Sequence, residues 1–179
     1  MNRIQSLFQK PGEKLIPFLT AGYPELDSTV ELVLGAVSAG ADMIEIGIPF
    51  SDPQADGPII QASSQQALKN GITLKTIFQQ VEQIRNQTKV PIALMGYYNP
   101  IYIYGVDKFL IDAKQAGVDG FIVVDLPPEE EGEFCMPALE AGLNFIYLTA
   151  PTTDDARLPR VVEHASGFVY FVSLSLIHI

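Results

Sequence analysis

The chain has little cysteine and little positive charge. Cys135 is the only cysteine among 179 residues, which excludes an internal disulfide and indicates a reducing compartment. Lys and Arg number 11 against 21 Asp and Glu, so the net charge is −10. Nucleic acids and anionic membranes bind clustered Lys and Arg, and this charge balance therefore argues against both as partners.

Long apolar runs are also lacking. No stretch approaches the ~18 apolar residues that a membrane span requires, and residues 1–14 lack the continuous apolar segment of a signal peptide. We therefore expect a cytoplasmic protein. The fractions of hydrophobic residues (47%) and charged residues (18%) are typical of a soluble globular protein with one substantial domain.

The chain does contain a repeated unit. An Ala-Gly pair, one linking residue, an Asp or Asn and an apolar run recur at 38–47, 115–125 and 140–150, with a weaker copy at 164–173. Glycine adopts positive φ without steric cost, so each of these glycines is expected to end a helix just before a strand. The spacing of Gly117, Gly142 and Gly167 is 25 residues, about one βα unit.

Six strands are predicted, because 15–20 and 91–96 are also apolar. The runs are continuous rather than alternating, which is typical of a parallel sheet buried on both faces. Helical patterns lie between them at 27–39, 73–87, 107–116, 129–141 and 154–164. The order is β-α repeated, which indicates an α/β architecture.

Two architectures fit this order. A doubly wound sheet usually has a Gly-rich phosphate loop after its first strand, and no GxGxxG occurs there. A (β/α)₈ barrel typically needs ~250 residues, and six units in this length scale to about that. We predict a single TIM-barrel domain over residues 1–173 that holds about six of eight units. Residues 174–179, "LSLIHI", stand where a helix is expected, and we expect them to be a non-native tail.

Glu45 is unusual because it lies between isoleucines in a predicted strand. Burying a carboxylate costs several kcal/mol unless something compensates. Strand alternation places Met43 and Glu45 on one face and Ile44 and Ile46 on the other. If the isoleucines face the helices, Glu45 points into the barrel mouth, where its raised pKa suits proton transfer. The alternative is a structural glutamate paired with a basic residue, and basic residues are scarce nearby.

Asp52 and Asp56 follow Glu45 in a turn-rich segment. Asp-Gly is a strong turn former, so a turn or capping role for Asp56 competes with a catalytic one, and Asp52 has the same ambiguity. Metal binding by the three carboxylates matches no coordination motif. The tyrosine-rich segment 96–105 is expected to be a loop that forms a partner surface, a substrate wall or a packed structural element.

Five segments, in order, resemble the tryptophan synthase alpha-subunit family. The most specific is 41–58, "ADMIEIGIPFSDPQADGP", and the others are 16–24, 95–101, 117–130 and 167–173. The resemblance spans residues 1 to about 173. It implies the first six strands of that family's barrel.

The resemblance implies a lyase of tryptophan biosynthesis. It would cleave indole-3-glycerol phosphate to indole and glyceraldehyde 3-phosphate with no metal or cofactor of its own. By position, Glu45 would be the general acid that protonates the indole ring, and Asp56 would stabilise the indole N–H. Phe18 and Tyr170 would bind the substrate. The chemistry needs one protonated and one ionised carboxyl group, which different environments can provide.

The resemblance also implies a partner. This is a β subunit carrying pyridoxal phosphate in an α₂β₂ assembly, contacted through Asp52, Pro53, Tyr97, Asn99 and Pro127. The family's phosphate site belongs to later units, so we expect negligible activity from the 179-residue chain. Two alternatives stay open. One is another phosphate-sugar enzyme on the same barrel, and the other is a non-catalytic activator of a pyridoxal-phosphate enzyme.

Overall fold

The fold is built on parallel strands in chain order. The computed structural model describes residues 2–173, so the predicted tail at 174–179 lies outside the described residues. One sheet consists of β1 (Phe18–Thr20), β2 (Ile44–Gly47), β3 (Ile92–Gly96), β4 (Gly120–Val123) and β5 (Asn144–Phe145). A second sheet pairs β6 (Leu148–Thr149) with β7 (Tyr170–Phe171). All pairings are parallel and no strand is out of chain order, which is the order of a barrel wall.

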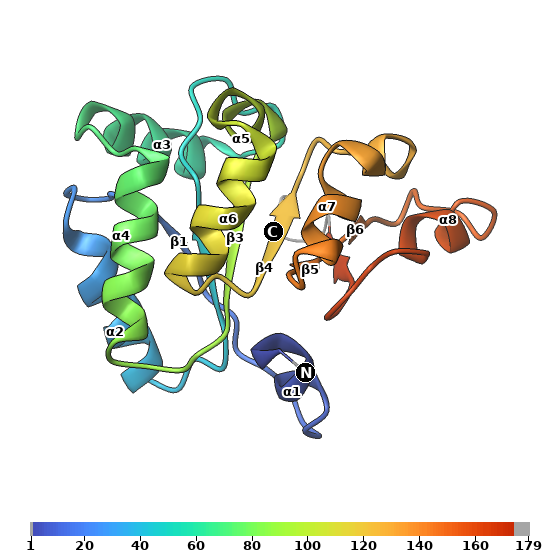
Figure 1. Ribbon diagram of the computed structural model, residues 1–179, viewed down its shortest axis with the longest axis horizontal. Helices are drawn as coiled ribbons and strands as arrows, with labels where there is room; N and C mark the ends of the chain where they lie inside the picture. The colour runs from blue at the N-terminus through green and yellow to red at the C-terminus, as the bar shows by residue number, and fades with distance from the viewer. Residues whose placement is uncertain (1, 174–179) are drawn as a thin grey trace.

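Helices cover the outer face of this wall and lie at both of its ends. The outer layer, with α4 and α6 in front of the strands in Figure 1, consists of α2 (Ser28–Ser38), α4 (Leu74–Arg85), α6 (Val106–Ala116), α7 (Cys135–Glu140) and α8 (Leu158–Val162). Two helices lie near the carboxyl ends of the strands, α3 (Pro58–Lys69) and α5 (Tyr98–Tyr104). The short helix α1 (Arg3–Phe8) lies at the opposite end. Among the described residues, no helix has the length and apolar character needed to cross a membrane.

Three of the four predicted helix-ending glycines are confirmed, because Gly40, Gly117 and Gly142 stand at the ends of α2, α6 and α7. Gly167 does not end a helix, since α8 already ends at Val162. Gly40, Gly117, Gly142 and Gly167 have φ values of 103°, 96°, 80° and 88°. This left-handed conformation reverses the chain from helix to strand with no steric penalty for glycine. The repeated Ala-Gly and Ser-Gly pairs therefore mark the αβ turns of the barrel.

Four element predictions were wrong in detail. Segment 96–105 was predicted as a loop, and its residues 98–104 form α5, whose first N–H group, that of Tyr98, donates to Asp125 Oδ1 at 2.8 Å. Segment 129–141 is divided into a 3₁₀ helix, η1 (Pro128–Glu133), and α7, because Phe134 has non-helical dihedrals after the poor helix former Gly132. In 154–164, the helix begins only at Leu158, since Pro159 favours the first turn. The fifth predicted strand is likewise divided into β5 and β6.

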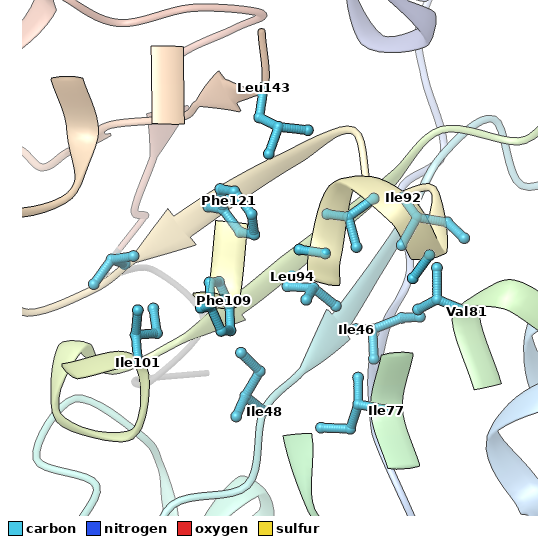
Figure 2. Packing of buried hydrophobic residues seen from close by; sticks show 14 of the residues in the cluster. Ile46, Ile48, Ile77, Val81, Ile92, Leu94, Ile101, Phe109, Phe121 and Leu143 are labelled. Carbon is cyan, nitrogen blue, oxygen red and sulfur yellow. The ribbon is translucent and has the colours of Figure 1, made fainter. Parts of the chain in front are cut away.

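Side chains alternate between two apolar layers. Ile44 and Ile46 belong to the larger cluster between the sheet and the helices, part of which Figure 2 shows around Ile46, Leu94 and Phe109. Met43 belongs to a second cluster inside the barrel, with Ile4, Leu7, Ala93, Ile122 and Ile146. The predicted faces of β2 are thus confirmed, and Glu45 shares the inner face with Met43.

A buried carboxylate fastens α1 to the amino-terminal end of the barrel. Asp119 is 3% exposed, and its oxygens lie 2.8 Å from Arg3 Nη1 and 2.6 Å from Arg85 Nη2. The backbone N–H of Ile92 also donates to Asp119 Oδ2 at 2.8 Å. This network holds the helix whose Ile4 and Leu7 close the inner core from below.

Candidate active site

The candidate site lies where β1, β2 and β3 end. Strand register places Glu45 opposite Phe18 on one side and opposite Ala93 on the other. Gly47 lies between Thr20 and Met95 in the same way. The carboxyl ends of parallel strands in a barrel meet at one rim, so the side chains that follow these strands converge there.

Glu45 is buried without a charged partner. Its side chain is 3% exposed, and desolvation raises its pKa from 4.5 to about 7. The ion pairs formed within residues 2–173 all join other residues. The alternative of a glutamate neutralised by a basic residue therefore has no support from the described residues. A carboxyl group with a pKa near neutrality can both donate and accept a proton.

Asp56 lies in the segment 51–57 between β2 and α3. Gly57 is the N-cap of α3 and no side chain caps that helix, so the Asp56 carboxylate is not used as a cap. Burial raises the pKa of Asp56, and a hydrogen bond from the Tyr97 hydroxyl opposes that rise. The backbone oxygen of Asp56 accepts a hydrogen bond from Gln61 Nε2 at 2.8 Å. The Asp56 carboxylate therefore caps no helix, and the Tyr97 hydroxyl favours its ionised form.

Phe18 and Asp56 line the same small cavity. Its volume is about 20 Å³, and its walls also include Gly47, Met95, Tyr97 and Val124. The ring of Phe18 lies over Gly47, so close that a β-carbon on residue 47 would be 2.3 Å from Phe18 Cζ. At this volume the cavity holds about one water molecule, and its walls combine an apolar face with a carboxylate.

Tyr170 lies near Glu45 although β7 is distant in the chain. Burial raises the pKa of the Tyr170 hydroxyl, and the Glu45 carboxylate raises it further. The structure thus places the four predicted acid and substrate residues, Phe18, Glu45, Asp56 and Tyr170, around the carboxyl end of the barrel wall.

The residues predicted to contact a partner differ from one another in solvent exposure. Asp52, Asn99 and Pro127 are exposed and Pro53 is half-buried. Tyr97 is 5% exposed, and its hydroxyl faces the segment that carries Asp56. A role of these residues in a protein interface stays a prediction.

Sequence reasoning missed the contacts that hold the site together. These include the Thr20 and Ser63 hydroxyls, buried 2.8 Å apart, and the contacts of Tyr97 and Gly47. Serine and glycine are too common for their types to have marked these positions.

A cavity of about 530 Å³ lies outside this site, among Phe50, Leu68, Ile72, Leu74 and Ile103. Within residues 2–173, no group of three or more His, Cys, Asp or Glu side chains could hold a metal ion.

The fold and the site define a class of protein, a TIM-barrel enzyme with a buried carboxyl group of raised pKa inside its carboxyl-terminal rim. Residues 4–176 match the family model described as "Tryptophan synthase alpha chain", and the chain belongs to this family. The reaction of the family is the lyase step that releases indole from indole-3-glycerol phosphate in tryptophan biosynthesis. The resemblance and the barrel fold predicted from the sequence are both confirmed.

Solved structures agree with this family. Tryptophan synthase subunit alpha from Legionella pneumophila str. Paris has a TM-score of 0.94 and 43% identity, over 98% of this chain and 69% of that chain. A tryptophan synthase complex from Pyrococcus furiosus has a TM-score of 0.85 and 50% identity, over 90% and 66%. A protein from Aquifex aeolicus VF5 has a TM-score of 0.92 and 39% identity, over 99% and 72%. This chain therefore spans about two thirds of the length of these relatives.

Proposed function

We propose that Glu45 and Asp56 perform the proton chemistry of the family's reaction in this chain. The observation that supports the proposal most strongly is the burial of Glu45, which raises the pKa of its carboxyl group to about 7. A protonated carboxyl group is thereby available near neutral pH, and the same group is a competent base once it has lost its proton.

The proposed reaction has two proton transfers. Glu45 gives its proton to the indole carbon that bears the glycerol phosphate chain, and the ring nitrogen becomes positively charged. The Asp56 carboxylate stabilises that N–H group. The ionised Glu45 then takes the proton of the adjacent side-chain hydroxyl while the carbon–carbon bond breaks. The bonding electrons return to the ring, indole and an aldehyde are formed, and Glu45 is protonated again.

Phe18 and Tyr170 are proposed to bind the substrate. Phe18 offers an apolar ring face beside Asp56 in the small cavity. Tyr170 carries a half-buried hydroxyl near Glu45. The reaction needs no cofactor on this chain, because both proton transfers use side chains already present.

The partner is proposed to be a β subunit that carries pyridoxal phosphate. Two solved structures from Pyrococcus furiosus support a subunit partner, since one is of a tryptophan synthase complex and the other concerns mutual activation of the tryptophan synthase a2b2 complex. Asp52, Pro53, Tyr97, Asn99 and Pro127 are the proposed contacts. Residues 1–173 are proposed to act as one barrel domain in the cytoplasm, with no nucleic acid or membrane partner.

The proposal is tested by replacing Glu45 with Gln in a subunit of the full length of its relatives. General acid–base groups contribute about 10²- to 10⁴-fold, so cleavage of indole-3-glycerol phosphate should fall by that factor. Glu31→Gln, on the exposed side of α2, is the matched control and should leave cleavage unchanged. If Glu45→Gln retains full cleavage, Glu45 is not the acid, and a role as a mere activator of the partner enzyme gains support.

A further inference from the structure

Tyr97 connects the end of β3 to the segment that follows β2. Its backbone comes directly after Gly96, the last residue of β3, and β3 is hydrogen-bonded to β2. The Tyr97 hydroxyl accepts a hydrogen bond from the Ala55 N–H group at 2.9 Å. Its ring lies 5.2 Å from the ring of Phe50, centroid to centroid, at an angle of 34°. A tyrosine on one strand end thus reaches the neighbouring loop with both its ring and its hydroxyl.

The same hydroxyl also contacts Asp56. A phenol has one hydrogen to donate and lone pairs that accept. The Ala55 N–H group occupies a lone pair, so the hydrogen is available to the Asp56 carboxylate, which lines the same small cavity as Tyr97 and whose pKa the hydroxyl lowers. Hydrogen bonds to an ionised acceptor are stronger than neutral ones. The hydroxyl therefore holds the segment through the backbone of Ala55 and lies beside the side chain of the next residue, Asp56.

The segment needs such an anchor. Residues 51–57 form no helix or strand, and Ser51, Asp52, Gln54, Ala55 and Gly57 are exposed. A carboxylate on an exposed irregular segment samples many positions, whereas proton transfer and charge stabilisation require a fixed one. Tyr97, at 5% exposure, is itself well fixed.

The next strand supports Tyr97 from the other side. The N–H group of Tyr98 donates to Asp125 Oδ1 at 2.8 Å, and Asp125 follows β4. The ends of three consecutive strands are thus connected, from Asp125 through the Tyr97–Tyr98 backbone to Ala55 and Asp56. This connection makes the position of Asp56 depend on the barrel wall rather than on its own loop.

We infer that Tyr97 is a positioning residue, and that its hydroxyl fixes the Asp56 carboxylate at the mouth of the barrel. The inference rests on the proposed role of Asp56. A merely structural role would reside in the ring, which packs on Phe50, while the positioning role resides in the hydroxyl. Tyr97→Phe separates the two, because it removes the hydroxyl and keeps the ring.

The test compares Asp56→Asn, Tyr97→Phe and the double variant in the full-length subunit. Losing a hydrogen bond to a charged group should lower kcat by about 10- to 100-fold, with KM changed less than about twofold because the ring wall stays. Without the donor, the pKa of Asp56 rises, so the acid limb of the kcat–pH profile should move to higher pH. The double variant should have the same rate as Asp56→Asn alone, because the two groups act as a unit.

Tyr147→Phe is the matched control. Tyr147 is buried to the same degree, at 4% exposure, and it belongs to the outer cluster between the sheet and the helices. This variant should leave kcat and the acid limb unchanged. A carboxyl NMR titration of Asp56 in Tyr97→Phe gives a readout independent of turnover and should show a raised pKa.

The outcomes separate this inference from the proposed function. Full activity in Asp56→Asn would refute the role of Asp56, and with it the basis of the inference. An inactive Asp56→Asn together with a Tyr97→Phe of unchanged kcat and unchanged acid limb would overturn the inference alone. It would also be overturned if Tyr97→Phe lowered kcat equally in the presence and absence of the Asp56 carboxylate.

Discussion

The ring of Phe18 lies directly on Gly47, so that a β-carbon at residue 47 would be 2.3 Å from Cζ and 2.7 Å from Cε2. The two residues belong to neighbouring strands, β1 and β2, and both line the small cavity beside Asp56. The ring of Phe18 therefore requires glycine at position 47, and this contact sets how far the ring lies from the cavity.

Gly47→Ala should displace the ring of Phe18. Insertion of a methyl group into a filled contact costs about 1–3 kcal/mol, so the free energy of unfolding should fall by that amount in urea denaturation. The displaced ring enters the cavity, and KM for indole-3-glycerol phosphate should rise in the full-length subunit.

Gly35→Ala is the control for the backbone effect of that substitution. Gly35 lies within α2, and a β-carbon there would meet nothing within 4 Å. Alanine is a better helix former than glycine by about 1 kcal/mol, so this variant should be more stable than the parent. If Gly47→Ala were as stable as Gly35→Ala, Phe18 would not be held against Gly47.

Glu45→Gln should stabilise the chain in a manner that depends on pH. The folded-state pKa of about 7 exceeds 4.5, so the folded chain favours the protonated group. Below pH 4.5 the group is protonated in both states and burial of charge costs nothing. Above pH 7 the folded chain must bury a carboxylate, and a difference of about 2.5 pKa units corresponds to about 3 kcal/mol.

Denaturation at about pH 4 and about pH 8 measures this difference. The advantage of Glu45→Gln over the parent should be larger at the higher pH by up to about 3 kcal/mol. Exposed Glu31→Gln should show no such change. An equal advantage at both pH values would mean that Glu45 is not desolvated in the folded chain.

Asp119→Asn should be among the most destabilising single substitutions outside the apolar core. It leaves the guanidinium of Arg85, which is only 10% exposed, without its carboxylate. Breaking a buried ion pair from one side costs about 3–5 kcal/mol. Glu129→Gln breaks an ion pair with Arg157 in which both side chains are about half exposed, and solvent screening should make it cost much less than Asp119→Asn. Equal losses in the two variants, measured by thermal or urea unfolding, would contradict the structural role of Asp119.

Much of the fold follows from local patterns. The Ala-Gly pairs predict where α2, α6 and α7 end, because only a residue tolerant of positive φ makes that turn, and Gly40, Gly117 and Gly142 have such values. The face of Glu45 follows from the two-residue period of a strand, which needs no knowledge of the rest of the chain. One element that was predicted wrongly depends on a distant group: α5 begins where Asp125, across the rim, accepts from its first N–H group.

The candidate site, too, could be predicted only in part from local sequence. An isolated glutamate among isoleucines is visible in the sequence, because burial of a carboxylate is costly wherever it occurs. Asp56 in an Asp-Gly turn is not distinguishable locally from a turn residue, and its place beside Phe18 and Tyr97 depends on which strands are neighbours. The proximity of Tyr170 to Glu45 likewise requires closure of the barrel wall. Conformational preference and side-chain alternation are properties of short segments, whereas the packing of Phe18 on Gly47 and the hold of Tyr97 on Asp56 arise only when strands far apart in the chain are set in register.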